Sequence, residues 1–134
     1  MSLKVLWRLV FKVVVSLAGG ILFHLLWLVL FLLVFGSGGQ APQPVLWLLA
    51  PAVTAAGFTV GAAALEPAAR TRRGFPRLLI WPLVGCAVGA GAVYRFGPML
   101  IVFGMLAAGT LSVLLREILS LSRSQARDDK GEAE

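Results

Sequence analysis

The chain has 134 residues, of which 59% are hydrophobic and 13% charged, and its mean hydropathy is +0.91. Soluble globular domains carry about 25% charged residues, so this composition excludes an ordinary water-soluble domain and indicates an integral membrane protein. The net charge of +6 comes from 12 Lys and Arg against 6 Asp and Glu. These basic residues flank apolar runs, so they indicate membrane topology, and we expect no nucleic-acid partner.

Two apolar runs fill the first half of the chain. A span needs about 20 apolar residues, and the runs 13–35 and 45–65 each meet that length. Between them the segment 36–44 holds turn-forming Gly and two X-Pro steps, where helix is disfavoured. The sequence therefore predicts two transmembrane helices here rather than one long helix.

Two further apolar runs fill the second half. The basic segment 66–77 precedes the run 78–94, and the turn residues 95–98 lead into the run 99–115, which extends to about residue 121. These last two runs are at the short end of the spanning range. We expect an all-α membrane protein with four transmembrane helices, and three spans plus a re-entrant segment is the alternative.

The chain divides into three regions on this interpretation. Residues 1–12 form a basic cytoplasmic or interfacial arm, residues 13–121 a four-helix transmembrane domain, and residues 122–134 a charged cytoplasmic tail. The tail has a high charge density and no apolar periodicity. We therefore expect it to lack regular structure unless a partner orders it.

The basic residues are distributed unequally between the two sides of a four-span protein. One side carries Arg95 alone, and the other carries both termini and the loop 66–77 with Lys4, Arg8, Lys12, Arg70, Arg72, Arg73, Arg77, Arg116, Arg123, Arg127 and Lys130. The positive-inside rule then places both termini in the cytoplasm. The expected location is a bacterial inner membrane.

The basic residues before the first and third spans are candidates for contact with lipid headgroups or a partner. Three of them recur every four residues and would form one stripe on a helix. Such a stripe can bind anionic headgroups or an acidic protein, and the alternative is simple snorkelling of helix-end side chains. The candidates are Lys4, Arg8, Lys12, Arg70, Arg72, Arg73 and Arg77.

Few side chains in the sequence are capable of catalysis. The chain has one cysteine, Cys86, and one histidine, His24. The acids lie at span ends or in the tail, so we expect no carboxylate pair at membrane depth, no catalytic residues, no metal site and no enzymatic activity. These acids are Glu66, Glu117, Asp128, Asp129, Glu132 and Glu134.

His24 lies at the middle of the first span, and ionisable residues within membranes are functional candidates. Gly20 precedes it by one helical turn, and Gly20-Ile-Leu-Phe-His24 resembles the small-xxx-His pattern of bacterial light-harvesting polypeptides. The resemblance implies a tetrapyrrole ligated by His24 over the space that Gly20 leaves. A proton or substrate path is a second interpretation. The third is a structural hydrogen bond to a hydroxyl of a neighbouring helix, from Thr54, Thr59, Thr110 or Ser112.

Small residues recur at three- or four-residue spacing on the later spans. Such stripes let helix backbones approach closely in lipid, so we expect the second to fourth helices to form a tight bundle. The first span is bulky and apolar over 21–35, which favours contact with lipid or a large apolar partner. The expected packing residues are Gly57, Gly61, Ala64, Gly85, Gly89, Gly104, Ala108 and Ser112.

Three classes of function fit this sequence. The first is a non-catalytic accessory or assembly subunit of a larger membrane complex. The second is a small oligomeric transporter or pore. The size and span count resemble those of the small multidrug-resistance exporters, although those exporters rely on an intramembrane carboxylate in the first span and this span offers only His24. A holin, small and hydrophobic with a charged tail, belongs to the same class. The third is a pigment- or haem-binding subunit. We expect the first, with other membrane subunits or further copies of the chain as partners.

Overall fold

The computed structural model describes residues 2–36, 43–66 and 71–133 and is all-helical, with no strand in these ranges. Four α-helices and one short 3₁₀ turn follow one another along the chain. They are α1 (Leu3–Phe35), α2 (Gln43–Leu65), α3 (Gly74–Val93), η2 (Tyr94–Phe96) and α4 (Pro98–Glu132).

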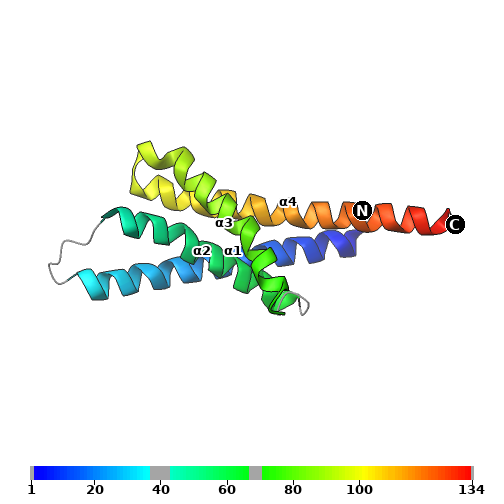
Figure 1. Cartoon of the computed structure of the whole chain (residues 1–134), viewed down its shortest axis with the longest axis horizontal. Coiled ribbons are helices and arrows are strands. Elements are labelled where there is room, and N and C mark those ends of the chain that lie inside the picture. Colours follow the sequence, from blue (N-terminus) through cyan, green and yellow to red (C-terminus); the bar gives the residue numbers. More distant parts are fainter. Residues whose placement is uncertain (1, 37–42, 67–70, 134) are drawn as a thin grey trace.

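The helices form two antiparallel hairpins that pack against each other (Figure 1). α1 pairs most closely with α2, and α3 pairs most closely with α4. The start of α1, the end of α2, the start of α3 and the end of α4 lie towards one end of the molecule, while η2 and the end of α1 lie at the other (Figure 1). The molecule therefore has one end that holds both termini.

Three of the helical segments are long and apolar enough to cross a membrane. They are Leu3–Val34, Gly74–Phe96 and Met99–Glu132. The described side chains of α2 add a shorter apolar segment, Leu49–Leu65. These lengths and compositions agree with the expected membrane integration.

α3 begins four residues before the apolar run that predicted it. Gly74 N–H donates to Thr71 Oγ1 at 3.1 Å, and Phe75 N–H donates to the Thr71 carbonyl at 3.1 Å. Thr71 therefore satisfies amides that the first turn of a helix leaves free. Because the helix starts here, Pro82 lies buried inside it rather than in its first turn.

The turn between α3 and α4 depends on Gly97. This residue has φ 114° and ψ 166°, in the left-handed half of backbone space that residues with a Cβ rarely adopt. Pro98 follows at the first helical position of α4, where its missing N–H costs nothing. This Gly-Pro pair explains why the fourth helix begins where the sequence predicts.

α4 continues as helix through Glu132, so the expectation of an unstructured tail is wrong. The reason lies in helix cooperativity: the apolar part of α4 supplies the nucleus, and each further residue then adds to an existing helix. Arg, Gln, Ala and Lys in this segment are good helix formers. Residues 118–132, called the C-terminal extension below, project beyond the bundle (Figure 1).

Phe58 of α2 lies at the centre of the packed helices and is fully buried. A Cβ added at Gly20 of α1 would meet Phe58 Cε2 at 2.6 Å, and one added at Gly109 of α4 would meet the same atom at 2.7 Å. The ring therefore occupies the space between two glycines on different helices. Cys86 of α3 also lies beside Gly109, so all four helices meet around this ring.

The expected bundle of the second to fourth helices, with the first helix apart, is wrong. A Cβ at Gly19 of α1 would clash with the backbone of Gly57, and one at Gly61 would lie 2.8 Å from Ser16 Cα. The small residues of α2 therefore face α1. The physical reason is that Ser16, Gly19 and Gly20 have small side chains or none, so α2 can approach α1 closely there. The bulky residues of α1 come after them along the chain.

Candidate functional site

His24 is buried in the packed part of α1 with 5% of its surface exposed. Its Nδ1 lies 3.0 Å from Thr54 Oγ1 of α2, and Thr54 Oγ1 donates its proton to the Ala50 carbonyl at 2.8 Å. Because a hydroxyl has a single proton, Thr54 accepts from the imidazole. We therefore assign the proton of His24 to Nδ1, and Thr54 is the partner among the four hydroxyls that the sequence offered.

The other three hydroxyls that the sequence offered as partners for His24 form hydrogen bonds within their own helices. Thr59 Oγ1 donates to the Ala55 carbonyl and Thr110 Oγ1 to the Leu106 carbonyl, at 2.8 Å and 2.7 Å. Ser112 Oγ donates to the Gly109 carbonyl at 2.7 Å. These bonds satisfy the hydroxyls locally, whereas the His24–Thr54 bond links α1 to α2.

Two buried polar atoms of α1 have no hydrogen-bond partner among the described residues. They are His24 Nε2 and Ser16 Oγ. With the proton on Nδ1, His24 Nε2 is a lone-pair acceptor that faces the packed interior. Such a nitrogen is chemically able to accept a proton or ligate a metal, although the described residues bring together no set of three metal-ligating side chains.

The structure does not provide the space for a tetrapyrrole at His24. The ring of Phe58 fills the position beside Gly20, with Cε2 2.6 Å from a Cβ built there. A flat macrocycle on His24 would require that ring to leave the core, where it is fully buried. In this structure Gly20 therefore makes space for an aromatic side chain of the same protein and leaves none beside it for a tetrapyrrole.

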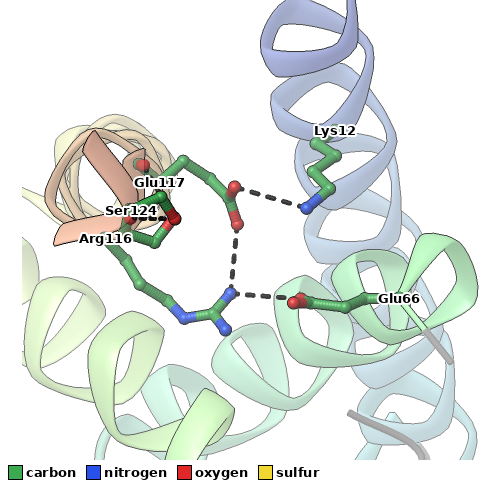
Figure 2. A network of polar contacts seen from close by, with 6 residues as sticks. Lys12, Glu66, Arg116, Glu117 and Ser124 are labelled. Atoms are coloured by element: carbon green, nitrogen blue, oxygen red, sulfur yellow. Dashed lines mark hydrogen bonds and ion pairs between the residues drawn. The ribbon is translucent and has the colours of Figure 1, made fainter. Parts of the chain in front are cut away.

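Four charged residues form an ion-pair cluster at the end of the molecule that holds both termini. Lys12 Nζ lies 3.3 Å from Glu117 Oε2, and Arg116 Nη1 lies 3.1 Å from Glu117 Oε1 and 3.5 Å from Glu66 Oε2. Figure 2 shows Glu117 between the lysine and the arginine, and the arginine between the two carboxylates. The cluster joins α1, the end of α2 and α4, and its formal charges cancel.

Glu117 is the most enclosed member of this cluster, with 9% of its surface exposed. Its pairing with Lys12 was not predicted from the sequence, because the two residues are 105 positions apart. The sequence does contain a signal for this pairing. Lys12 is the last charged residue before the first apolar run, and Arg116 and Glu117 are the first charged residues after the fourth. In an antiparallel arrangement these positions reach the same depth.

The candidate headgroup contacts divide into three groups in the structure. Lys4 and Arg8 are exposed on α1, whereas the charge of Lys12 points inward to Glu117. Exposed arginines also surround the start of α3 at Arg72, Arg73 and Arg77. Arg70 lies outside the described residues. Lys12 therefore joins α1 to α4 within the bundle.

The predicted packing residues lie on two separate seams. Gly57 and Gly61 of α2 contact α1, and Ala64 is exposed. On the second seam, a Cβ at Gly89 would clash with the Gly104 carbonyl. One at Gly85 would lie 2.7 Å from the Ala108 carbonyl and from Ser112 Oγ. The first seam therefore holds α1 against α2, and the second holds α3 against α4.

A cavity of about 430 Å³ lies next to the ion-pair cluster, between the first part of α1 and the root of the C-terminal extension. Its lining mixes apolar and charged side chains. The lining residues are Val5, Arg8, Leu9, Phe11, Lys12, Leu65, Glu117 and Leu121.

Comparison with known proteins gave no relative from which a function could be carried over. The chain matches no protein-family model, no curated protein and no solved structure at a significant level. Any function for this protein therefore has to be inferred from its own packing, charges and shape.

Proposed function

We propose that the protein is a non-catalytic accessory subunit of a larger membrane complex, and that its C-terminal extension is the part that contacts the partner. The observation that carries this proposal is the extension itself: α4 continues as exposed helix to Glu132, well beyond the packed bundle (Figure 1). Residues 122–132 of the extension are all exposed. A helical segment that is polar all round is typical of one that bridges to another protein.

The proposal includes four membrane crossings with both termini in the cytoplasm of a bacterial inner membrane. α2 has 23 residues, about 34 Å at 1.5 Å per residue, which is enough to cross a hydrocarbon core of about 30 Å. The end of the molecule that holds the termini also holds the exposed basic residues in the first part of α1, around the start of α3 and in the extension. The positive-inside rule supports this end as the cytoplasmic one.

The surface of the extension favours a charged protein partner over lipid. Arg123, Arg127 and Lys130 recur at spacings of four and three, and they line one shared hollow. Asp128 and Glu132 lie on a different face of the same helix. A helix that binds flat on a membrane needs an apolar face, and residues 122–132 have none.

The ion-pair cluster fixes the direction of the extension. Arg116 and Glu117 lie at its root, and their pairs with Glu66 and Lys12 tie that root to α2 and α1. The helix is therefore presented at a defined angle to the bundle, which lowers the ordering cost of binding.

Cross-linking in native membranes tests the proposal directly. A photoreactive amino acid at Ala126, which lines the basic hollow, should capture one defined protein. The matched control places the same amino acid at Leu33, an exposed apolar residue of α1. Removal of residues 122–134 should abolish the cross-linked complex and shift the native mass after mild solubilisation, while the chain remains in the membrane.

A native mass that corresponds to copies of this chain alone, with the same number of copies after that removal, would contradict the accessory role. It would favour the second candidate, a small oligomeric transporter or pore. The observation that favours this candidate is the lone pair of His24 Nε2, buried at membrane depth without a described partner. Its test is proton flux into proteoliposomes, which His24→Gln should abolish.

A further inference from the structure

The cavity beside the ion-pair cluster has an amphipathic lining. Five of its lining residues are apolar and come from all sides, namely Val5, Leu9, Phe11, Leu65 and Leu121. The other three are charged and come from α1 and α4, namely Arg8, Lys12 and Glu117. A ligand that fills this space must therefore present both hydrocarbon and a charged group.

The free charge in the cavity is positive. Lys12 and Glu117 neutralise each other at 3.3 Å, and Glu117 also pairs with Arg116. Arg8 is exposed and has no ion-pair partner among the described residues. A guanidinium without a carboxylate partner is suited to phosphate, which it binds with two parallel hydrogen bonds. Charge complementarity thus favours an occupant with one negative charge.

The size of the cavity favours a small amphiphile over a helix from a partner protein. A helix with its side chains is about 10 Å across, so about 430 Å³ holds roughly one helical turn. The volume falls in the range of about 300–1,000 Å³ that is typical of small-molecule sites. The phosphate and glycerol region of one lipid, with the first part of its acyl chains, is an amphiphile that fits these limits.

The depth of the cavity agrees with that occupant. Lys12 is the last charged residue before the apolar run of α1, and the cavity extends from it towards Val5. It therefore lies on the headgroup side of that apolar run, directly next to the hydrocarbon, if the chain is embedded as proposed above. The inference uses that embedding but does not depend on the accessory role.

We infer that this cavity binds one anionic phospholipid, with Arg8 on the phosphate and Leu9, Leu65 and Leu121 against the start of the acyl chains. Lys12 and Glu117 form the inner wall. The bound lipid would then fill the gap between the first part of α1 and the root of the C-terminal extension.

Native mass spectrometry of the full chain in detergent tests this inference. Phosphatidylglycerol and phosphatidylcholine with identical acyl chains are added in equal amounts, and the fraction of chain that carries each lipid is measured. We expect a preference for phosphatidylglycerol that Arg8→Gln lowers by about fivefold, from about 1 kcal/mol per basic residue at a membrane surface. The matched control is Lys4→Gln, which removes an exposed charge from the same helix but does not line the cavity.

A second variant tests the cavity independently of charge. Leu121→Trp adds bulk to the lining from α4 and should reduce phosphatidylglycerol binding while Arg8 is still present. Retention of helicity by circular dichroism shows that each variant is folded.

Three results would overturn the inference. One is equal binding of the two lipids by the natural chain. Another is an equal loss with Lys4→Gln and Arg8→Gln, which would indicate general surface attraction. The third is displacement of the lipid by millimolar glycerol 3-phosphate, which would indicate a site for phosphate alone. Because the measurement uses the purified chain, its failure leaves the accessory role untouched.

Discussion

At the scale of single residues, the buried polar side chains of this protein mainly serve to join helices. His24 reaches Thr54 across α1 and α2, and Glu117 reaches Lys12 across α4 and α1. Unpaired polar groups are costly in an apolar environment. These bonds therefore specify which helices pair, and at what relative height, in a lipid that is as apolar as most of the side chains.

His24 gives the first prediction. His24→Leu removes the donor to Thr54 and should lower the free energy of unfolding by about 0.5–2 kcal/mol, the range of hydrogen bonds between membrane helices. His24→Gln keeps an N–H donor and should lose less. The measurement is SDS-induced unfolding in mixed micelles, followed by circular dichroism.

Thr54→Val is the matched partner variant, because it removes the acceptor from the other helix. The double variant should cost less than the two single variants added together. Additive costs would show that the observed bond does not contribute to stability.

Glu117 gives the second prediction. Glu117→Gln leaves Lys12 and Arg116 opposite a single carboxylate, Glu66, and should lower stability by about 1–3 kcal/mol, as expected for hydrogen bonds to charged groups. Glu132→Gln is the control, because that residue is exposed at the end of α4. Unfolding midpoints measured at low and high salt check the result, and equal midpoints for the two variants would contradict it.

The sequence predicted these residues unequally. His24 was recognisable as the ionisable side chain within an apolar run, and Thr54 was one of four possible partners. Which hydroxyl meets His24 depends on how α2 is rotated about its own axis where it faces α1. The packing of Gly19 on Gly57 determines that rotation. Phe58 gave no signal at all, since a phenylalanine in an apolar helix looks the same whether it faces lipid or the core.

At the scale of helices, two seams of small residues hold the molecule together. α1 and α2 meet through Gly19, Gly57 and Gly61, while α3 and α4 meet through Gly89 and Gly104. Close backbone contact of this kind maximises van der Waals packing, which is the main source of helix association in lipid. The hairpins are thus the tightest units, and Phe58 fills the space between them.

The third prediction compares glycines on and off these seams. Gly57→Leu should separate α1 from α2 at a cost of about 1–3 kcal/mol or more, since overpacking against a backbone has little room to relax. Gly91→Leu is the matched control, because a Cβ at that glycine of α3 meets no atom within 4 Å. The measurement is SDS-induced unfolding of both variants. Equal loss of stability would mean that the seam is not where the helices meet.

The sequence predicted the positions of the helices along the chain better than it predicted which helices pack against each other. The apolar runs predicted each helix, and the early start of α3 follows from the bonds that Thr71 makes. Small-residue spacing also marked Gly57 and Gly89 as contact positions. It could not say which helix each would contact, because a stripe on one helix is equally suited to any smooth surface.

At the scale of the whole molecule, the two ends differ in charge. Exposed basic residues in the first part of α1, around the start of α3 and in the C-terminal extension gather at the end with the termini. Arg95, in η2, lies at the opposite end (Figure 1). This separation is what the sequence predicted from an even number of crossings.

The fourth prediction concerns this polarity in the cell. Alkaline phosphatase is active only in the periplasm, so a fusion after Glu134 should be inactive and a fusion after Gly97 should be active. The positive-inside rule supplies the reason. Activity at Glu134 would reverse the orientation or change the number of crossings, and protein levels measured by immunoblot control for unequal expression.

The unbroken length of α4 has a mechanical consequence. From Glu117 the helix extends about 22 Å to Glu132 in one direction and about 28 Å to Pro98 in the other, at 1.5 Å per residue. Because α3 packs tightly along the first part of α4, the two helices would move together as one lever, with the ion pairs of Glu117 as its pivot and arms of similar length. A sideways push of about 5 Å on the tip would swing the Gly97 turn by about 6 Å the opposite way. Force applied at the tip of α4 would thereby be transmitted to the opposite end of the molecule.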